Sequence, residues 1–184
     1  PRFILTSIGG NEHNILSIAQ RDRRFDFILG EEPNLPVDDR AELLPEAAVR
    51  ETLRDWMKDK TDVLTAIRAA TGAPIVQIEP PPPLPRAQVL AYPKEFFRSL
   101  LDQRNMSSDT LRYKMWRVQS ELLREICAEA GIVYVRNPPD VIDSDGMLVR
   151  HACGKDATHA NDSYGEAIVA RALRCISDQF AKAG

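Results

Sequence analysis

Three short apolar runs alternate with longer segments of helical periodicity along the chain. The runs, at 3–8, 73–79 and 132–135, are rich in strand-forming residues and end near glycine or proline, which indicates buried parallel strands. Between them, apolar residues recur at helical spacing over 49–67 and 111–130. Strands and helices in this order predict a three-layer α/β/α fold around a parallel sheet.

Local signals mark the expected ends of the two long helices. Pro45 suits the first turn of the first helix, and Gly72 is the residue expected to cap its end. The pattern is also compatible with a break near 58–61. The second helix has a Ser-Ser-Asp cap at 107–109 and closes at Gly131.

Three further segments have weaker patterns. Ser163 and Glu166 form a capping-box pair, which predicts a last helix from that point. A short helix is expected around 94–103. Residues 20–38 look irregular, and their apolar piece at 25–29 is either a strand or a loop packed on the core.

The proline-rich run at 80–85 directly follows the second strand. Proline cannot continue a central strand, so the run is expected to be extended along the surface. It fits either a rigid loop that frames a pocket or a ligand for an SH3 or WW module. We favour the loop, because the run lies inside the domain.

Composition narrows the classes of protein. With 184 residues, 43% of them hydrophobic and 28% charged, the chain is expected to be one globular domain spanning 1–184. Its formal net charge of −3 and the lack of a basic stripe argue against a nucleic-acid binder. No run reaches transmembrane length and no signal peptide is visible, so no membrane partner is expected. The composition leaves the oligomeric state open.

The three cysteines have no CxxC spacing, which favours reduced thiols and a cytoplasmic location. His151 and Cys153 precede His159 closely, but without the spacing of a metal site. We therefore expect neither a metal nor a cofactor.

A polar loop before the last helix carries the first candidate chemistry. Asp156 stands three residues before His159, so its carboxylate can accept the Nδ1–H of the ring and leave Nε2 free as a general base. The alternative is a polar surface loop followed by a helix cap.

The second candidate follows the first strand, where Gly10, Asn11 and His13 lie in the sequence Gly-Gly-Asn-Glu-His-Asn. In open α/β sheets, ligands bind beyond the carboxyl ends of the strands. The alternative is a glycine-rich turn. For His13 two interpretations stay equal: a pocket residue that contacts substrate, or a loop histidine bonded to the backbone.

These two stretches together resemble a known family. Gly10 and Asn11 resemble the Gly-x-Asn-Asp block of the SGNH (GDSL-type) hydrolases, although Glu12 follows the asparagine here. The Asp-Ala-Thr-His sequence at 156–159 resembles the C-terminal Asp-x-x-His block of that family. The order and separation of the blocks also match. The resemblance implies a flavodoxin-like SGNH hydrolase fold.

The family uses a Ser-His-Asp triad, so the resemblance implies roles for this chain's residues. His159 would be the general base and later the acid, Asp156 would orient it, and Asn11 would donate its side-chain amide to the oxyanion hole. Gly10 is a candidate substrate contact, and His13 is one under the first of its two interpretations. The expected substrate is a small-molecule or carbohydrate ester.

The nucleophile of such a triad is missing from the pattern. The chain has no Gly-Asp-Ser block, and we reject Ser7, Ser17 and Ser144 because no motif supports them and Ser7 would crowd the same strand end as Asn11. Three strands also make a thin sheet for such long helices, and no Met starts the chain. We therefore expect the fold to be incomplete at the N-terminus, with the serine upstream of Pro1. The alternative is an inactive relative that only binds its ligand.

Overall fold

A three-stranded parallel sheet lies at the centre of the computed structural model, which describes residues 3–20, 23–93, 98, 101 and 105–182. Its strands are β1 (Ile4–Thr6), β4 (Ile75–Ile78) and β5 (Val133–Val135), in the order β1-β4-β5. Within β4, Ile75 pairs with Ile4 of β1 and Val76 pairs with Val133 of β5. The three predicted apolar runs therefore form strands, each shorter than its run.

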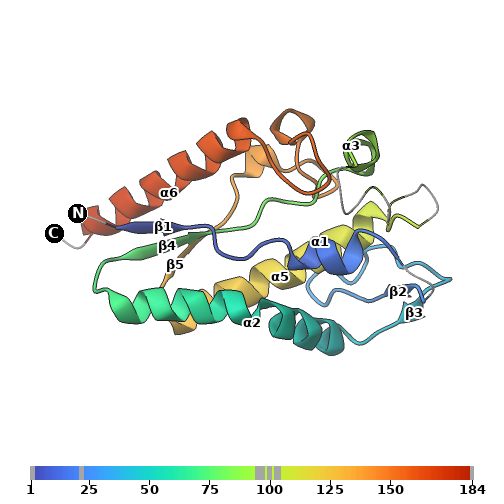
Figure 1. Ribbon diagram of the computed structural model, residues 1–184, viewed down its shortest axis with the longest axis horizontal. Helices are drawn as coiled ribbons and strands as arrows, with labels where there is room; N and C mark the ends of the chain where they lie inside the picture. The colour runs from blue at the N-terminus through green and yellow to red at the C-terminus, as the bar shows by residue number, and fades with distance from the viewer. Residues whose placement is uncertain (1–2, 21–22, 94–97, 99–100, 102–104, 183–184) are drawn as a thin grey trace.

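Helices cover both faces of this sheet (Figure 1). Helix α6 (Asp162–Lys182) lies on one face, and α2 (Glu46–Ala70) and α5 (Asp109–Glu129) lie on the other. Side chains alternate along β4, so Val76 joins the core under α6 while Ile75 joins the core under α2 and α5. The prediction of an α/β fold with a parallel sheet is confirmed. Its finer assignment to the flavodoxin-like SGNH fold stays a prediction.

Helix α2 is continuous, so the break considered near 58–61 is absent. Lys58 Nζ lies 2.6 Å from Asp62 Oδ2, one turn further along the helix, and this ion pair spans the expected break. The helix ends at Ala70 with Thr71 in an extended conformation as its C-cap. The prediction that Gly72 caps this helix was therefore wrong, because the backbone turns extended before the glycine.

The predicted ends of α5 are confirmed. Ser108 Oγ accepts a hydrogen bond of 3.1 Å from the backbone N–H of Leu111, and Gly131 has φ +65° just past the last turn.

The start of α6 differs from the predicted capping box. Asn161 Oδ1 accepts the backbone N–H of Ser163 at 2.9 Å and of Tyr164 at 3.3 Å, so the helix begins at Asp162. Ser163 itself lies inside the first turn, where its side chain is not needed as a cap.

The segment before α2 packs against α5 through a buried ion pair. Its short strands β2 (Phe25–Asp26) and β3 (Glu42–Leu43) pair in parallel. Lys114 Nζ of α5 lies 2.7 Å from Asp26 Oδ1, and both side chains are buried. Lys114 also donates to the carbonyl of Phe27, a core residue. The apolar piece at 25–29 thus contributes both a short strand and a loop packed on the core.

The proline-rich run at 80–85 is held inside the molecule. Pro80, Pro82, Pro83 and Leu84 are buried. The Pro80 carbonyl accepts hydrogen bonds from Trp116 Nε1 at 3.1 Å and from Asn137 Nδ2 at 2.8 Å. The expectation that the run lies along the surface was wrong for these four residues, which no SH3 or WW module could reach, whereas Pro81 lines a pocket, as the favoured interpretation of a pocket-framing loop predicts.

Short helices complete the described part of the chain. They are α1 (Glu12–Ser17), α3 (Arg86–Ala91) and the 3₁₀ turns η1 (Pro139–Val141) and η2 (Arg150–Ala152). The helix predicted around 94–103 falls on residues that, apart from 98 and 101, lie outside the described chain.

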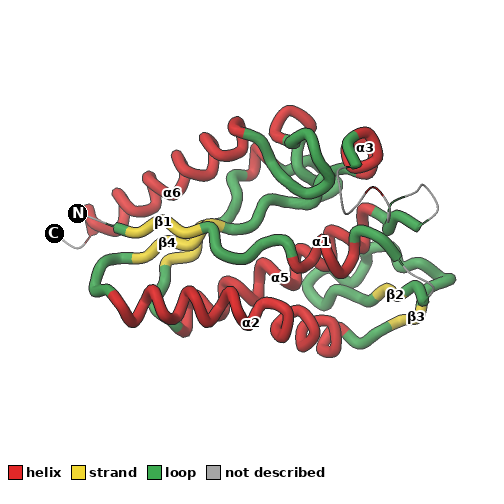
Figure 2. Tube along the Cα trace, viewed as in Figure 1, coloured by secondary structure: helices red, strands yellow, loops and turns green. Residues whose placement is uncertain are grey.

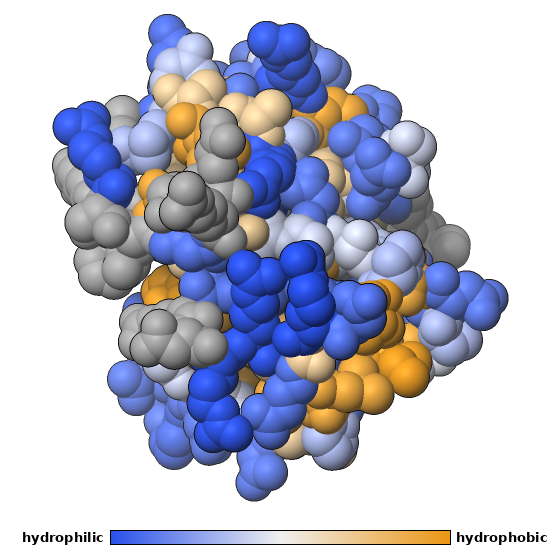
Figure 3. Space-filling model, turned by 90° about the vertical axis from the view of Figure 1, so that its right-hand side faces the viewer, coloured by the Kyte–Doolittle hydropathy of each residue, from blue (hydrophilic) through white to orange (hydrophobic). Residues whose placement is uncertain are grey.

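The loops that follow β1 and β4 leave the sheet at the same end, away from the two chain termini (Figure 2). Seen from the end of the molecule opposite the termini, the surface is largely hydrophilic, with apolar side chains gathered toward one lower edge (Figure 3). None of the helices in the described ranges is long and apolar enough to cross a bilayer.

Candidate functional site

A tight turn before α6 presents His159 at the carboxyl end of the sheet. Cys153 and Ala160 form an antiparallel bridge, and the backbone N–H of Gly154 donates to the His159 carbonyl at 2.8 Å. A Cβ at position 154 would lie only 2.5 Å from that carbonyl oxygen. Only glycine therefore allows the two sides of the turn to approach this closely.

Asp156 uses both carboxylate oxygens inside this turn. Its Oδ1 accepts the backbone N–H of Thr158 at 2.9 Å and of His159 at 2.7 Å. Its Oδ2 lies 2.9 Å from His159 Nδ1. Because a carboxylate only accepts, the proton of the neutral ring lies on Nδ1, and in that tautomer Nε2 keeps its lone pair. The side chain of His159 is 74% exposed, so a ligand can reach the ring.

The hydrogen bonds around Asp156 also act on its pKa. Partial burial works to raise the pKa, but the two backbone N–H groups and the His159 ring outweigh it and hold the pKa of this carboxyl below its ordinary value. The carboxylate is therefore ionised at neutral pH and available to orient the imidazole.

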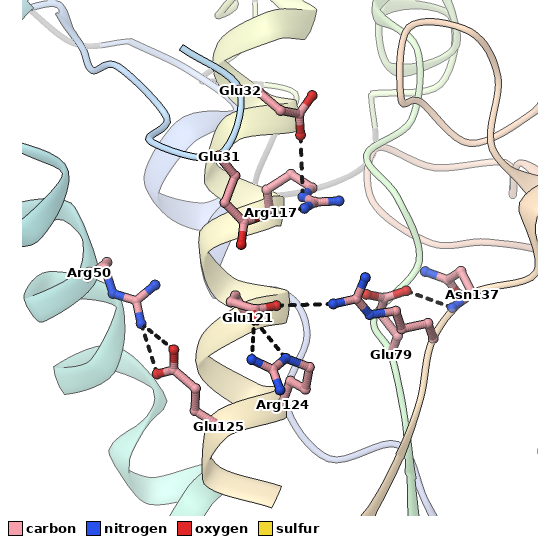
Figure 4. A network of polar contacts seen from close by, with 10 residues as sticks. Glu31, Glu32, Arg50, Glu79, Arg117, Glu121, Arg124, Glu125 and Asn137 are labelled. Atoms are coloured by element: carbon pink, nitrogen blue, oxygen red, sulfur yellow. Dashed lines mark hydrogen bonds and ion pairs between the residues drawn. The ribbon is translucent and has the colours of Figure 1, made fainter. Parts of the chain in front are cut away.

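A buried polar network fixes the helix that follows this turn. The hydroxyl of Tyr164, in the first turn of α6, lies 2.7 Å from Asn137 Oδ1 and 3.0 Å from the Glu79 carbonyl oxygen, and its single hydrogen is shared between these two acceptors. The backbone N–H of Asn137 in turn donates to the Glu79 carboxylate at 2.6 Å, a contact drawn in Figure 4. Burial raises the pKa of Glu79 above its ordinary value despite this hydrogen bond. These contacts connect the ends of β4 and β5 to the start of α6.

The loop between β1 and α1 contributes the second half of the site. Gly9 and Gly10 have φ values of +79° and +125°, which only glycine adopts readily. A Cβ at position 10 would lie 3.1 Å from Pro80 Cβ, so the loop also packs closely against the proline-rich run.

Glu12 occupies the backbone donors of that loop. Its Oε2 accepts the N–H of Gly10 at 3.0 Å, the N–H of Asn11 at 3.1 Å and the Nε2 of Gln119 at 2.9 Å. The two backbone N–H groups are thus engaged inside the protein, and the side chain of Asn11 is the donor that remains for a ligand.

The amide of Asn11 is oriented by its neighbour on α1. Asn14 Nδ2 donates to Asn11 Oδ1 at 3.1 Å, while Asn11 Nδ2 has no hydrogen-bond partner within the described ranges. The carbonyl side of the amide is therefore held by the protein, and the NH₂ side is left to donate.

Asn11 and His159 line one pocket of about 600 Å³ at this end of the sheet. Gly10 lies in its wall as well, so the structure brings together three of the residues proposed from sequence. The remaining lining residues come from the loop after β1, from the start of α1, from α2, from the proline-rich run and from the turn before α6: Ser7, Ile8, Gly9, Glu12, Lys60, Val63, Pro81 and Thr158. A residue with a hydrogen-bond acceptor and a residue with a donor thus border a shared space large enough for a small ligand.

His13 is not among the residues that line this pocket. It belongs to α1, is 0% exposed, and its Nδ1 contacts Gln119 Oε1 of α5 at 3.1 Å. Burial lowers the pKa of the ring to about 4, so it is neutral at pH 7. Neither of our two interpretations holds as written: the ring packs under the loop, and its partner is a side chain of α5 instead of a backbone group.

Sequence reasoning missed other residues at this site. Lys60 and Val63 follow the outer side of α2, where polar or isolated apolar residues normally indicate only a solvated face. Ser7, which we rejected as a nucleophile, is exposed in the wall of the pocket, but it makes no hydrogen bond to His159. Among these residues, only Glu12 could have been singled out from the sequence, because it is an acidic residue in the first turn of a helix and follows a glycine pair.

The described part of the chain contains no group of three or more His, Cys, Asp or Glu that could hold a metal ion.

Comparison with known proteins gives no match to a family model, to a curated protein or to a solved structure.

Proposed function

We propose that this chain carries the acid/base and oxyanion part of a serine ester hydrolase site of the SGNH type. The observation that carries the proposal is the shared pocket, which is lined both by an imidazole oriented by a carboxylate and by an oriented amide donor. These are the two groups that acyl transfer needs besides the nucleophile.

The chemistry assigns one role to each group. His159 Nε2 removes the proton of the attacking hydroxyl, and the same nitrogen later returns it to the leaving alcohol. Asp156 keeps the ring in the required tautomer and stabilises the imidazolium that forms. Asn11 Nδ2 donates to the oxyanion of the tetrahedral intermediate, where one such donor contributes about 3 kcal/mol to lowering the barrier. Water repeats the sequence on the acyl-enzyme.

The nucleophilic serine of this proposal comes from sequence upstream of Pro1. Ser7 is the serine that lines the pocket within the described residues, but it lies on the same strand end as Asn11 and is not bonded to His159. The substrate is a small-molecule or carbohydrate ester.

The missing contact between a serine and His159 supports a second candidate, a catalytically inactive binding module with the same pocket. The burial of the proline-rich run removes the partner surface that we had considered for such a module. Its ligand would have to enter the pocket itself.

Labelling of the full-length protein with a fluorophosphonate probe separates these candidates. We expect labelling of the wild type, loss of labelling in His159→Ala, and retention in Ser7→Ala, with the adduct mapped by mass spectrometry to a serine outside residues 1–184. His151→Ala is the matched control, because His151 is an exposed histidine that does not line the pocket.

Three results would count against the proposal in different ways. An adduct on Ser7 would move the nucleophile into this chain. Labelling that survives His159→Ala would remove His159 from the mechanism. A wild-type protein that folds, as judged by circular dichroism, and is never labelled would favour the binding module.

A further inference from the structure

Lys60 is a cation in the wall of the pocket that no step of the proposed mechanism uses. It stands on the outer side of α2 and its side chain is exposed. A Cβ placed on Gly9 would lie 3.9 Å from Lys60 Cβ, so the base of the lysine side chain stands close to the loop that carries Asn11. Lys60 and Asn11 therefore border the same pocket.

The partners of this lysine differ from those of its neighbour on the same helix. Lys58 is bonded to Asp62 at 2.6 Å, whereas Lys60 forms no ion pair and no hydrogen bond with any residue in the described ranges. The charge of Lys60 is thus left for a group that enters the pocket.

The carboxylates near the pocket are already engaged. Glu12 is buried, and its Oε2 accepts three hydrogen bonds from the loop and from Gln119. Asp156 is bonded to His159 and to two backbone N–H groups. Neither carboxylate forms an ion pair with Lys60, so neither neutralises the ammonium group directly.

Apolar side chains line the pocket together with Lys60 and the reacting groups. Val63 stands three residues further along α2, on the same side of the helix, and Pro81 faces the pocket from the proline-rich run. A ligand with a short apolar spacer and an anionic end would cover these side chains and place its charge at the ammonium group.

We propose that Lys60 selects esters that carry a carboxylate or another anionic group a few bonds from the scissile bond. The inference rests on the proposed function, since the ester must lie between Asn11 and His159. Lys60 acts in binding and takes no part in bond breaking, so it should affect KM for anionic esters more than kcat.

The test compares matched nitrophenyl esters with the full-length protein. Mono-4-nitrophenyl glutarate carries the charge, and 4-nitrophenyl butyrate is its neutral counterpart. For the wild type we expect a higher kcat/KM with the anionic ester. In Lys60→Met the ratio of the two kcat/KM values should fall about tenfold through KM, as expected for loss of a charge-assisted hydrogen bond. Lys60→Arg should largely restore the ratio, and Lys58→Met should leave it unchanged.

A binding measurement separates failure of this inference from failure of the proposed function. Monomethyl glutarate is titrated into the wild type and into Lys60→Met, with amide chemical shifts as the readout.

If neither nitrophenyl ester is hydrolysed but monomethyl glutarate still binds about tenfold more weakly to Lys60→Met, the proposed function fails and the anion site stands. If the neutral ester is hydrolysed in a His159-dependent way but the ratio is the same in wild type and Lys60→Met, the inference is overturned and the proposed function stands. If neither ester is hydrolysed and Lys60→Met binds monomethyl glutarate as the wild type does, both are overturned.

Discussion

At the residue scale, Asp156 combines a structural task with a chemical one. Oδ1 holds the turn through the N–H groups of Thr158 and His159, and Oδ2 holds the ring of His159. Because the two tasks fall on different oxygens, two substitutions can separate them.

We predict that Asp156→Asn keeps the turn and loses activity. Its side-chain oxygen can still accept both backbone N–H groups, but its NH₂ group cannot accept from His159 Nδ1, so kcat for ester hydrolysis should fall on the order of 10³- to 10⁴-fold. Asp156→Ala should lose the same activity and also about 2 kcal/mol of stability, because the turn loses its acceptor. Steady-state kinetics and urea denaturation measure the two effects. An active Asp156→Asn would show that the carboxylate does not orient the ring.

The pH dependence of this contribution follows from the direction of the pKa shift. The pKa of Asp156 is lowered in the folded protein, so the unfolded chain binds the proton first as the pH falls. The stability from this carboxylate is therefore complete at neutral pH and is lost as the pH falls through the lowered pKa.

Sequence alone could place some of these residues and not others. Asp156, His159 and Asn11 stand in short motifs at a strand end and before a helix, where the topology of a parallel sheet brings side chains together. Lys60 has no such signal, because a lysine on the outer side of a long helix looks the same whether it faces solvent or a pocket. His13 was misplaced because the chain turns into α1 directly after Asn11 and directs the ring under the loop.

At the scale of elements, the cap of α6 shows how neighbouring polar residues compete. The sequence Ala-Asn-Asp-Ser before this helix offers three residues that are good N-caps, and the spacing to Glu166 favoured Ser163. The structure uses Asn161, which also donates Nδ2 to the carbonyls of His151 at 2.7 Å and Cys153 at 3.2 Å. Tertiary contacts of the preceding turn thus selected the cap.

We predict that Asn161→Ala lowers the free energy of unfolding by about 2 kcal/mol, the upper range for loss of a helix cap, because both the cap and the turn lose contacts. Ser163→Ala is the matched control and should change stability by less than about 0.5 kcal/mol, as for an ordinary surface substitution. Urea denaturation of both variants decides the point. A larger loss in Ser163→Ala than in Asn161→Ala would mean that the capping box forms after all.

The long helices were predictable because their apolar periodicity extends over many residues, as in α5, and the strands because their short apolar runs end near glycine or proline. The continuous helix of α2 was less evident, since the ion pair from Lys58 to Asp62 supports a stretch whose apolar pattern weakens. The proline-rich run at 80–85 was misjudged for a different reason. Its composition predicts an extended backbone, but only the fold reveals that donors such as Trp116 and Asn137 hold it inside.

At the scale of the whole molecule, the ion pair between Lys114 and Asp26 connects the segment before α2 to helix α5. Both side chains are buried, and Asp26 also accepts the backbone N–H groups of Phe27 at 2.7 Å and Asp38 at 2.9 Å. Such a pair costs desolvation when it forms, but removing one partner leaves the other charge buried alone.

We predict that Lys114→Met lowers the free energy of unfolding by about 3–5 kcal/mol, the cost of an uncompensated buried charge. Addition of Asp26→Asn should recover a large part of this loss, because the second substitution removes that charge while keeping an acceptor for the backbone. Urea denaturation of the two single variants and the double variant forms the cycle. Additive losses would show that the two charges are not coupled.

The central claim is that Asn11 and His159, from opposite ends of the chain, act on one substrate in one pocket. A crystal structure of the phosphonylated full-length protein tests it most directly. We expect the phosphonyl oxygen within hydrogen-bond distance of Asn11 Nδ2, and the ring of His159, still bonded to Asp156, facing the oxygen of the modified serine. An adduct whose phosphonyl oxygen is bound by other donors, with His159 directed away from it, would contradict the account.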